Sequence, residues 1–109
     1  MIGLFSYRTN NIGDDFQSYV LASLLQRAPG WIPRDGPNAD PGVVTDLIAN
    51  GFVTIESLPF HPTLRVEFLS VWLGPLLLSD RARVDILGSY GTIGCRDTET
   101  LERCLTLGL

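Results

Sequence analysis

Hydrophobic and polar residues follow two periods along this chain, one typical of buried strands and one typical of amphipathic helices. Segments of strand length that are rich in apolar residues lie at residues 2–5, 31–33, 65–73 and 92–95. The spacing of helices that cover a sheet, with apolar residues on one face, recurs at residues 18–26, 81–87 and 98–107. This succession of strands and helices predicts an α/β domain with a mostly parallel, Rossmann-like sheet flanked by helices.

Residues 43–52 fit two different structures. Their apolar positions have helical spacing, and Asn50-Gly51 would end such a helix. The same residues also fit a buried strand that ends in a glycine turn. Periodicity alone leaves both interpretations open. The next segment is less ambiguous, because two prolines make residues 58–62 a rigid loop.

The helical spacing also predicts which residues face the sheet and where helices end. In the first helix we expect the apolar face to consist of Phe16, Val20, Leu21, Leu24 and Leu25. In the last helix we expect Leu101, Cys104 and Leu105 to face inward. Ser79-Asp80 resembles a helix cap, Gly88 is expected to stop the helix that follows, and Gly108 lies where a terminal glycine belongs.

Residues 10–17 connect the first strand to the first helix and are the first place to look for function. Gly13 would allow a sharp turn, Asp14 would cap the helix, and Gln17 would complete a capping box. A helix start attracts anions, but the adjacent carboxylates of Asp14 and Asp15 repel them. A sugar hydroxyl that donates to Asp14 fits this charge better, the alternative being that Asp14 only caps the helix.

Size and charge exclude several function classes. A chain of 109 residues holds one small domain, and its net charge of -4 without a basic stripe argues against nucleic acid. The longest apolar stretch, residues 68–78, contains Gly74 and Pro75 and is too short to span a bilayer. Arg8 and Asn10 interrupt the first apolar run, so we see no signal peptide and expect a cytoplasmic protein.

Cysteine and histidine usage argues against a metal centre. Cys95, Cys104 and His61 are the only residues of these two types, too few for a four-ligand structural zinc site. We therefore expect no metal and no cofactor, and we expect both cysteines to be small buried thiols. The sequence stops one residue after Gly108, where an α/β unit would begin its next strand, so we expect a single domain over residues 1–109 that is an incomplete part of a larger protein.

Three short segments resemble, in order, those of the polysaccharide pyruvyl transferases, which move pyruvate from phosphoenolpyruvate onto sugar hydroxyls as a ketal. Residues 11–17, Asn-Ile-Gly-Asp-Asp-Phe-Gln, are similar to that family's N-terminal Asn-x-Gly-Asp motif. Residues 47–52 resemble its strand ending in Asn-Gly and an aromatic residue, which favours a strand at Leu47–Ala49. Residues 93–101 resemble its Ile-Gly-Cys-Arg-Asp segment, which opens a helix.

The resemblance implies the N-terminal lobe of a two-lobed, glycosyltransferase-B-like enzyme of exopolysaccharide or cell-surface glycan synthesis. Its partners would be a glycan acceptor and phosphoenolpyruvate, and a second lobe would supply much of the phosphoenolpyruvate site, so this chain alone is expected to be inactive. The implied catalytic residue is Asp14, which would hold or deprotonate the acceptor hydroxyl. The implied substrate-binding residues are Asn11, Gly13, Asp15, Asn50, Gly51 and Arg96.

Several of these roles have plain structural alternatives. Arg96 would reach an anion or form a salt bridge with Asp97 or Glu99, and Asn50 would bind a hydroxyl or serve as a turn residue, which we favour. Arg8 and Arg34 are weaker candidates. The Pro59–Pro62 loop departs from the family's Trp-Pro-Pro pattern, which puts a role for His61 in doubt. The alternative function is a non-catalytic module that binds sugar or protein, with an exposed sheet edge that favours self-association.

Overall fold

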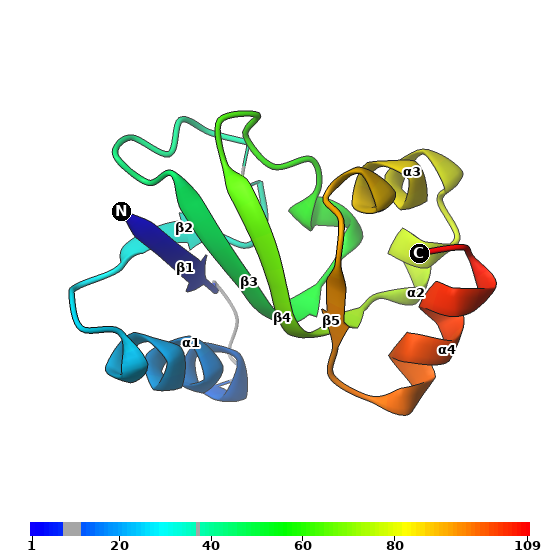
Figure 1. Ribbon diagram of the computed structural model, residues 1–109, viewed down its shortest axis with the longest axis horizontal. Helices are drawn as coiled ribbons and strands as arrows, with labels where there is room; N and C mark the ends of the chain where they lie inside the picture. Colours follow the sequence, from blue (N-terminus) through cyan, green and yellow to red (C-terminus); the bar gives the residue numbers. More distant parts are fainter. Residues whose placement is uncertain (8–11, 37) are drawn as a thin grey trace.

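The sheet of this protein has five strands, all parallel, in the order β2-β1-β3-β4-β5 (Figure 1). The computed structural model describes residues 1–7, 12–36 and 38–109. The strands are β1 (Ile2–Ser6), β2 (Gly30–Pro33), β3 (Asp46–Val53), β4 (Arg65–Leu73) and β5 (Ile93–Cys95). The predicted Rossmann-like α/β fold is confirmed, and the ambiguous segment at 43–52 is a strand from Asp46 onward.

The helices lie on both sides of this sheet. They are α1 (Ile12–Leu24), α2 (Pro75–Leu78), α3 (Arg81–Ser89) and α4 (Thr98–Thr106), with a 3-10 turn at Ile55–Ser57. In Figure 1, α1 lies by itself beside β1 and β3, whereas α2, α3 and α4 gather at the other side of the molecule, near β5. The order 2-1-3-4-5 is a common doubly wound topology, in which the direction of strand addition reverses between β1 and β3 although all the strands are parallel.

One face of the sheet, the core face, carries the hydrophobic core. Register places Leu47 beside Val66 and Ala49 beside Phe68, and these side chains belong to one buried cluster. The cluster continues into α2, α3 and α4 through Leu77, Leu87 and Cys104, and into the loop before β4 through Leu58, Phe60 and Leu64. Helices and a proline-containing loop together therefore exclude water from this face.

The opposite face, the outer face, is covered by α1 as the single helix among the residues that the structure describes. The ring of Tyr19 in α1 lies 6.1 Å from that of Trp31 in β2. The predicted apolar face of α1 is wrong in part, because Phe16 and Leu24 are 65% and 73% exposed, whereas Ser18 is buried. Val20, also expected on this face, is 44% exposed, whereas Leu21 and Leu25 are half-buried, and no second helix of the described chain covers the exposed apolar side of α1.

The ends and inner face of the last helices follow local rules only in part. Asp80 caps α3 as predicted by accepting from the Arg83 backbone N–H at 3.2 Å, but Gly88 does not stop the helix, which runs to Ser89. In α4 the predicted inner face is right for Cys104, which is buried, but wrong for Leu101 and Leu105, which are exposed, while Thr100 is buried in their place. A stripe four residues apart contacts the core, and Leu101 lies one step around the helix from it.

Gly108 ends α4 as predicted. Its φ is +81°, and the Leu109 and Gly108 N–H groups donate to the carbonyls of Cys104 and Leu105 at 2.9 and 3.1 Å. This pair of bonds is the Schellman arrangement, which satisfies carbonyls that a helix end leaves unpaired.

Candidate functional site

The candidate site lies at the carboxyl edge of the sheet, at the switch point between β1 and β3 where the direction of strand addition reverses. In doubly wound sheets ligands bind at this position, because the loops after the two strands diverge and leave a crevice. The segment after β1 leads into α1, and Asn50 and Gly51 lie in β3 beside the end of β1. The first and second motif segments therefore meet at this edge.

The first motif segment differs from its prediction. The helix α1 begins at Ile12, so Gly13 lies within its first turn rather than in a tight turn, and Asp14 is a helical residue rather than the cap. Several residues with cap preference follow one another here, and local preference does not select among them. Asn11 and Arg8 lie outside the described residues, as do the side chains of Asp14 and Asp15. Gly13 is exposed.

Asn50 is buried inside a strand rather than in a turn, so the turn interpretation is wrong. Its side chain is 3% exposed, and its backbone carbonyl accepts a hydrogen bond of 2.5 Å from the Tyr7 hydroxyl. Its side-chain oxygen Oδ1 is buried and has no hydrogen-bond partner among the residues that the structure describes. A buried acceptor of this kind costs free energy unless it is satisfied.

Gly51 is where the first motif touches the second. Its φ is +72°, and a Cβ added there would lie 2.7 Å from the Tyr7 hydroxyl and 3.3 Å from Oε1 of Gln17. The close approach of the Gln17 amide to this backbone requires glycine both for its conformation and for its lack of a side chain. Gln17, which closes the first motif segment and had been assigned only a capping role, thus lies at the site.

A bulge in β4 arranges the outer face next to this position. Asn50 pairs with Leu69 and Gly51 with Val71, so Ser70 is the extra residue, with a φ of +56°. Beyond the bulge Phe52 pairs with Trp72, and their rings are 5.0 Å apart. The bulge returns the alternating pattern to register, so Val71 enters the core while Trp72 stays on the outer face.

Arg96 brings the third motif to the second. Its guanidinium lies 4.9 Å from the centre of the Phe52 ring, a cation–π contact. The predicted salt-bridge partners are engaged elsewhere, since Glu99 pairs with Arg103 at 2.6 Å and Asp97 accepts from the Thr100 N–H at 2.8 Å. Arg96 is exposed, so its N–H groups can reach an anion at the sheet edge.

Hydrogen bonding to Thr100 also lowers the pKa of Asp97, and the nearby charges of Arg96 and Arg103 contribute less to this shift. Asp97 therefore stays ionised as the cap of α4. An ionised carboxylate at a helix start is favoured by the helix dipole, which fixes the turn that presents Arg96.

Arg34 provides a contrasting cation at the other side of the reversal point. It follows β2, its guanidinium lies 4.9 Å from the centre of the Tyr7 ring, and it pairs with Asp35 through two bonds of 3.1 and 3.0 Å. Its side chain is buried and its charge is already neutralised. Arg34 therefore positions Tyr7, and it is Arg96 that offers charge to a ligand.

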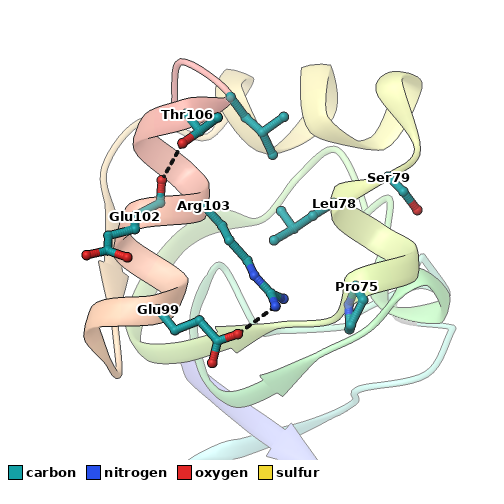
Figure 2. Close-up of a pocket in the computed structure, with 8 residues that line it drawn as sticks. Pro75, Leu78, Ser79, Glu99, Glu102, Arg103 and Thr106 are labelled. Atoms are coloured by element: carbon teal, nitrogen blue, oxygen red, sulfur yellow. Dashed lines mark hydrogen bonds and ion pairs between the residues drawn. The ribbon is translucent and has the colours of Figure 1, made fainter.

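Two cavities lie beside the helices and strands of this domain. The smaller, about 240 Å³, lies between α1 and the outer face and is lined by Phe16, Gln17, Val20, Leu21, Asn50, Leu69 and Ser70. The larger, about 570 Å³, lies between α2 and α4 and contains none of the predicted site residues. Figure 2 shows the side chain of Arg103, on the α4 side of this larger cavity, directed toward Glu99 of the same helix, so the cation among its lining residues is already paired. The smaller cavity is therefore the better candidate for a ligand site, because Gln17 and Asn50 line it.

His61 lies away from the site. It precedes β4, and its ring nitrogen Nδ1 is 2.8 Å from the Thr63 hydroxyl. The start of β4 is at the amino edge of the sheet, opposite the candidate site. Histidine therefore contributes nothing to the groups gathered around Asn50.

The described chain also limits other kinds of site. Within residues 1–7, 12–36 and 38–109 no three His, Cys, Asp or Glu side chains come together as metal ligands would. No helix in the same residues has the length and apolar character needed to cross a membrane.

Sequence reasoning missed Tyr7 and Ser70, and it assigned Gln17 to a cap. Tyr7 directly follows the first strand, a position at which a site residue could have been expected, whereas nothing local marks Ser70 as a bulge. Comparisons of this chain with models of protein families, with curated proteins and with solved structures found no match.

Proposed function

We propose that this chain is the acceptor-side, N-terminal lobe of a polysaccharide pyruvyl transferase with a glycosyltransferase-B-like architecture. The observation that carries the proposal is the contact among the three segments that resemble this family. Gln17 of the first segment lies against Gly51 of the second, and Phe52 of the second lies under Arg96 of the third. Segments that serve one site are expected to meet in this way, although they are far apart in the sequence.

In the proposed reaction two acceptor hydroxyl oxygens bond to the central carbon of the enol ester. The methylene carbon takes up a proton and becomes a methyl group, the bond from carbon to the phosphate oxygen breaks, and inorganic phosphate leaves. Asp14 accepts a hydroxyl proton, and Arg96 holds an anionic group of the donor. A second lobe supplies the remaining cations, and the cytoplasmic location expected from the sequence is part of the same proposal.

A direct assay tests this function. The reading frame that contains these residues is extended to its natural end, and the product is incubated with phosphoenolpyruvate and candidate glycans. We expect phosphate release together with a pyruvyl ketal, detected by its methyl resonance. Saturable glycan binding without phosphate release would contradict the proposal and favour the alternative, a non-catalytic binding module.

Asp14→Asn separates catalysis from helix stability in this assay. Because Asp14 lies in the first turn of α1, removing its charge should cost only about 0.3–1 kcal/mol of favourable interaction with the helix dipole, so the melting temperature should fall only slightly. Loss of the base should lower the transfer rate by roughly 10²-fold. Asp85→Asn, the same change on the exposed side of α3, is the matched control and should leave transfer unchanged. An unaltered rate in Asp14→Asn would refute its catalytic role.

A further inference from the structure

The two cysteines of this chain lie in contact although they are nine positions apart in the sequence. Cys95 ends β5 and Cys104 lies in α4, and their sulfur atoms are 3.9 Å apart. Sequence reasoning expected two small buried thiols and gave no reason for them to meet. The fold brings them together because α4 returns along the core face beside the strand that precedes it.

The two thiols differ in access. Cys104 is 3% exposed, whereas Cys95 is only half-buried at the sheet edge, directly before Arg96. Burial, and to a smaller extent the neighbouring Cys95, raise the pKa of the Cys104 thiol to about 11. Since the thiolate is the reactive form, an external reagent meets Cys95 first, and Cys104 is placed to react second.

The site is also rigid enough to hold the pair together. The Arg96 N–H donates to the Val71 carbonyl at 2.9 Å, and Asp97 caps α4 in the next turn. At the other end of α4 the Leu109 N–H donates to the Cys104 carbonyl at 2.9 Å. Both cysteines therefore lie on anchored backbone, and a disulfide requires their sulfur atoms to approach from 3.9 Å to about 2 Å.

We propose that Cys95 and Cys104 are a redox-active pair that forms an intramolecular disulfide with a small-molecule disulfide such as oxidised glutathione. The Cys95 thiolate attacks one glutathione sulfur and forms a mixed disulfide, releasing one glutathione. Cys104 then attacks the Cys95 sulfur, and the second glutathione leaves with the proton that Cys104 gives up. Two protein thiols are oxidised, and one glutathione disulfide is reduced to two glutathione molecules.

The closed disulfide ties α4 to the end of β5 beside Arg96. Because it removes conformational freedom from the unfolded chain, the oxidised protein should have a higher melting temperature than the reduced protein. This inference does not depend on the proposed function, since it concerns only these two thiols.

The test uses the folded 109-residue protein in glutathione buffers of increasing oxidised fraction at neutral pH, followed by alkylation and intact-mass measurement. We expect a monomer that has lost two hydrogens, carries no alkyl or glutathione group, and yields one linked peptide pair. Closure should be faster in buffer than in urea, because folding brings the sulfurs together. A wild type that keeps two alkylatable thiols, stops at the glutathione adduct, or forms covalent dimers would overturn the proposal.

Single variants assign the two steps. Cys104→Ser should accumulate the glutathione adduct on Cys95, whereas Cys95→Ser should stay unmodified over the same time because Cys104 is buried. Cys104→Ala repeats the first experiment without burying a hydroxyl, and circular dichroism checks that each variant is folded. Equal modification of both single variants would contradict the assigned order, while the wild-type masses decide closure by themselves.

Discussion

At the scale of single residues, Gly51 is under two constraints at once. Its φ of +72° disfavours any side chain, and an added Cβ would also lie 2.7 Å from the Tyr7 hydroxyl. That hydroxyl is held by the Asn50 carbonyl, so it cannot move away without losing a buried hydrogen bond. The backbone strain and the steric clash can be separated by experiment.

Gly51→Ala should destabilise the protein by more than Gly42→Ala. Gly42 has a similar φ of +61°, but an added Cβ there has no neighbour within 4 Å in the described chain. Gly42→Ala therefore measures the left-handed backbone alone, about 1–2 kcal/mol, and Gly51→Ala adds the clash. Urea unfolding of both variants gives the two free energies. Equal losses of unfolding free energy in the two variants would show that Tyr7 and Gln17 move away from the added Cβ at no energetic cost.

At the scale of the element, α3 shows why a glycine near a helix end is ambiguous in sequence. Gly88 lies inside the helix, and the chain leaves it two residues later, where the Tyr90 N–H donates to the Leu87 carbonyl and Gly91 has a φ of +91°. Both glycines are local stop signals, and only the second has the left-handed conformation that a stop uses.

Gly88→Ala should therefore stabilise the protein by about 0.5–1 kcal/mol, because alanine loses less conformational entropy in a helix than glycine. The added Cβ would lie 3.5 Å from Leu109, an ordinary packing distance. Thermal unfolding monitored by circular dichroism checks this. Gly91→Ala is the control and should lower the melting temperature, and a destabilised Gly88→Ala would mean that α3 ends before Gly88 in solution.

At the scale of the whole molecule, Phe60 joins three parts of the fold. It belongs to the loop before β4, and its ring lies near those of Phe5 in β1, Phe68 in β4 and Tyr90 after α3, at 6.1, 6.1 and 5.3 Å. Its backbone N–H donates to the Tyr90 hydroxyl at 3.1 Å. A loop residue thus takes the position in the core that a covering helix would fill in a larger α/β domain.

Phe60→Ala should lower the free energy of unfolding by about 3–5 kcal/mol, because it removes a buried ring and leaves a cavity shared by several elements. Phe16→Ala is the matched control, since that ring is 65% exposed, and should stay within about 0.5 kcal/mol of wild type. During urea unfolding of Phe60→Ala, the tryptophan fluorescence and the circular dichroism signal should change at the same urea concentration. A loss below about 1 kcal/mol would contradict a central role for this ring.

The sequence by itself determined the features that depend on near neighbours along the chain. The segments rich in apolar residues at 2–5 and 65–73 predicted strands, and both strands are present. Asp80 predicted a helix cap and Gly108 a helix end, and both are found there. These features are readable because a period of two or a single cap residue requires only a few consecutive positions. The alternation of such elements also predicted the class of the fold.

Only the tertiary structure decided the relations between elements. The orientation of α1 that exposes Phe16 and buries Ser18, the bulge at Ser70, and the contacts of Arg96 with Phe52 and of Cys95 with Cys104 each involve partners distant in sequence. A hydrophobic pattern shows that a helix has an apolar side, but the surface available in the sheet selects which residues it buries. The candidate site depends on such contacts, so the motifs predicted its members and the fold determined how they meet.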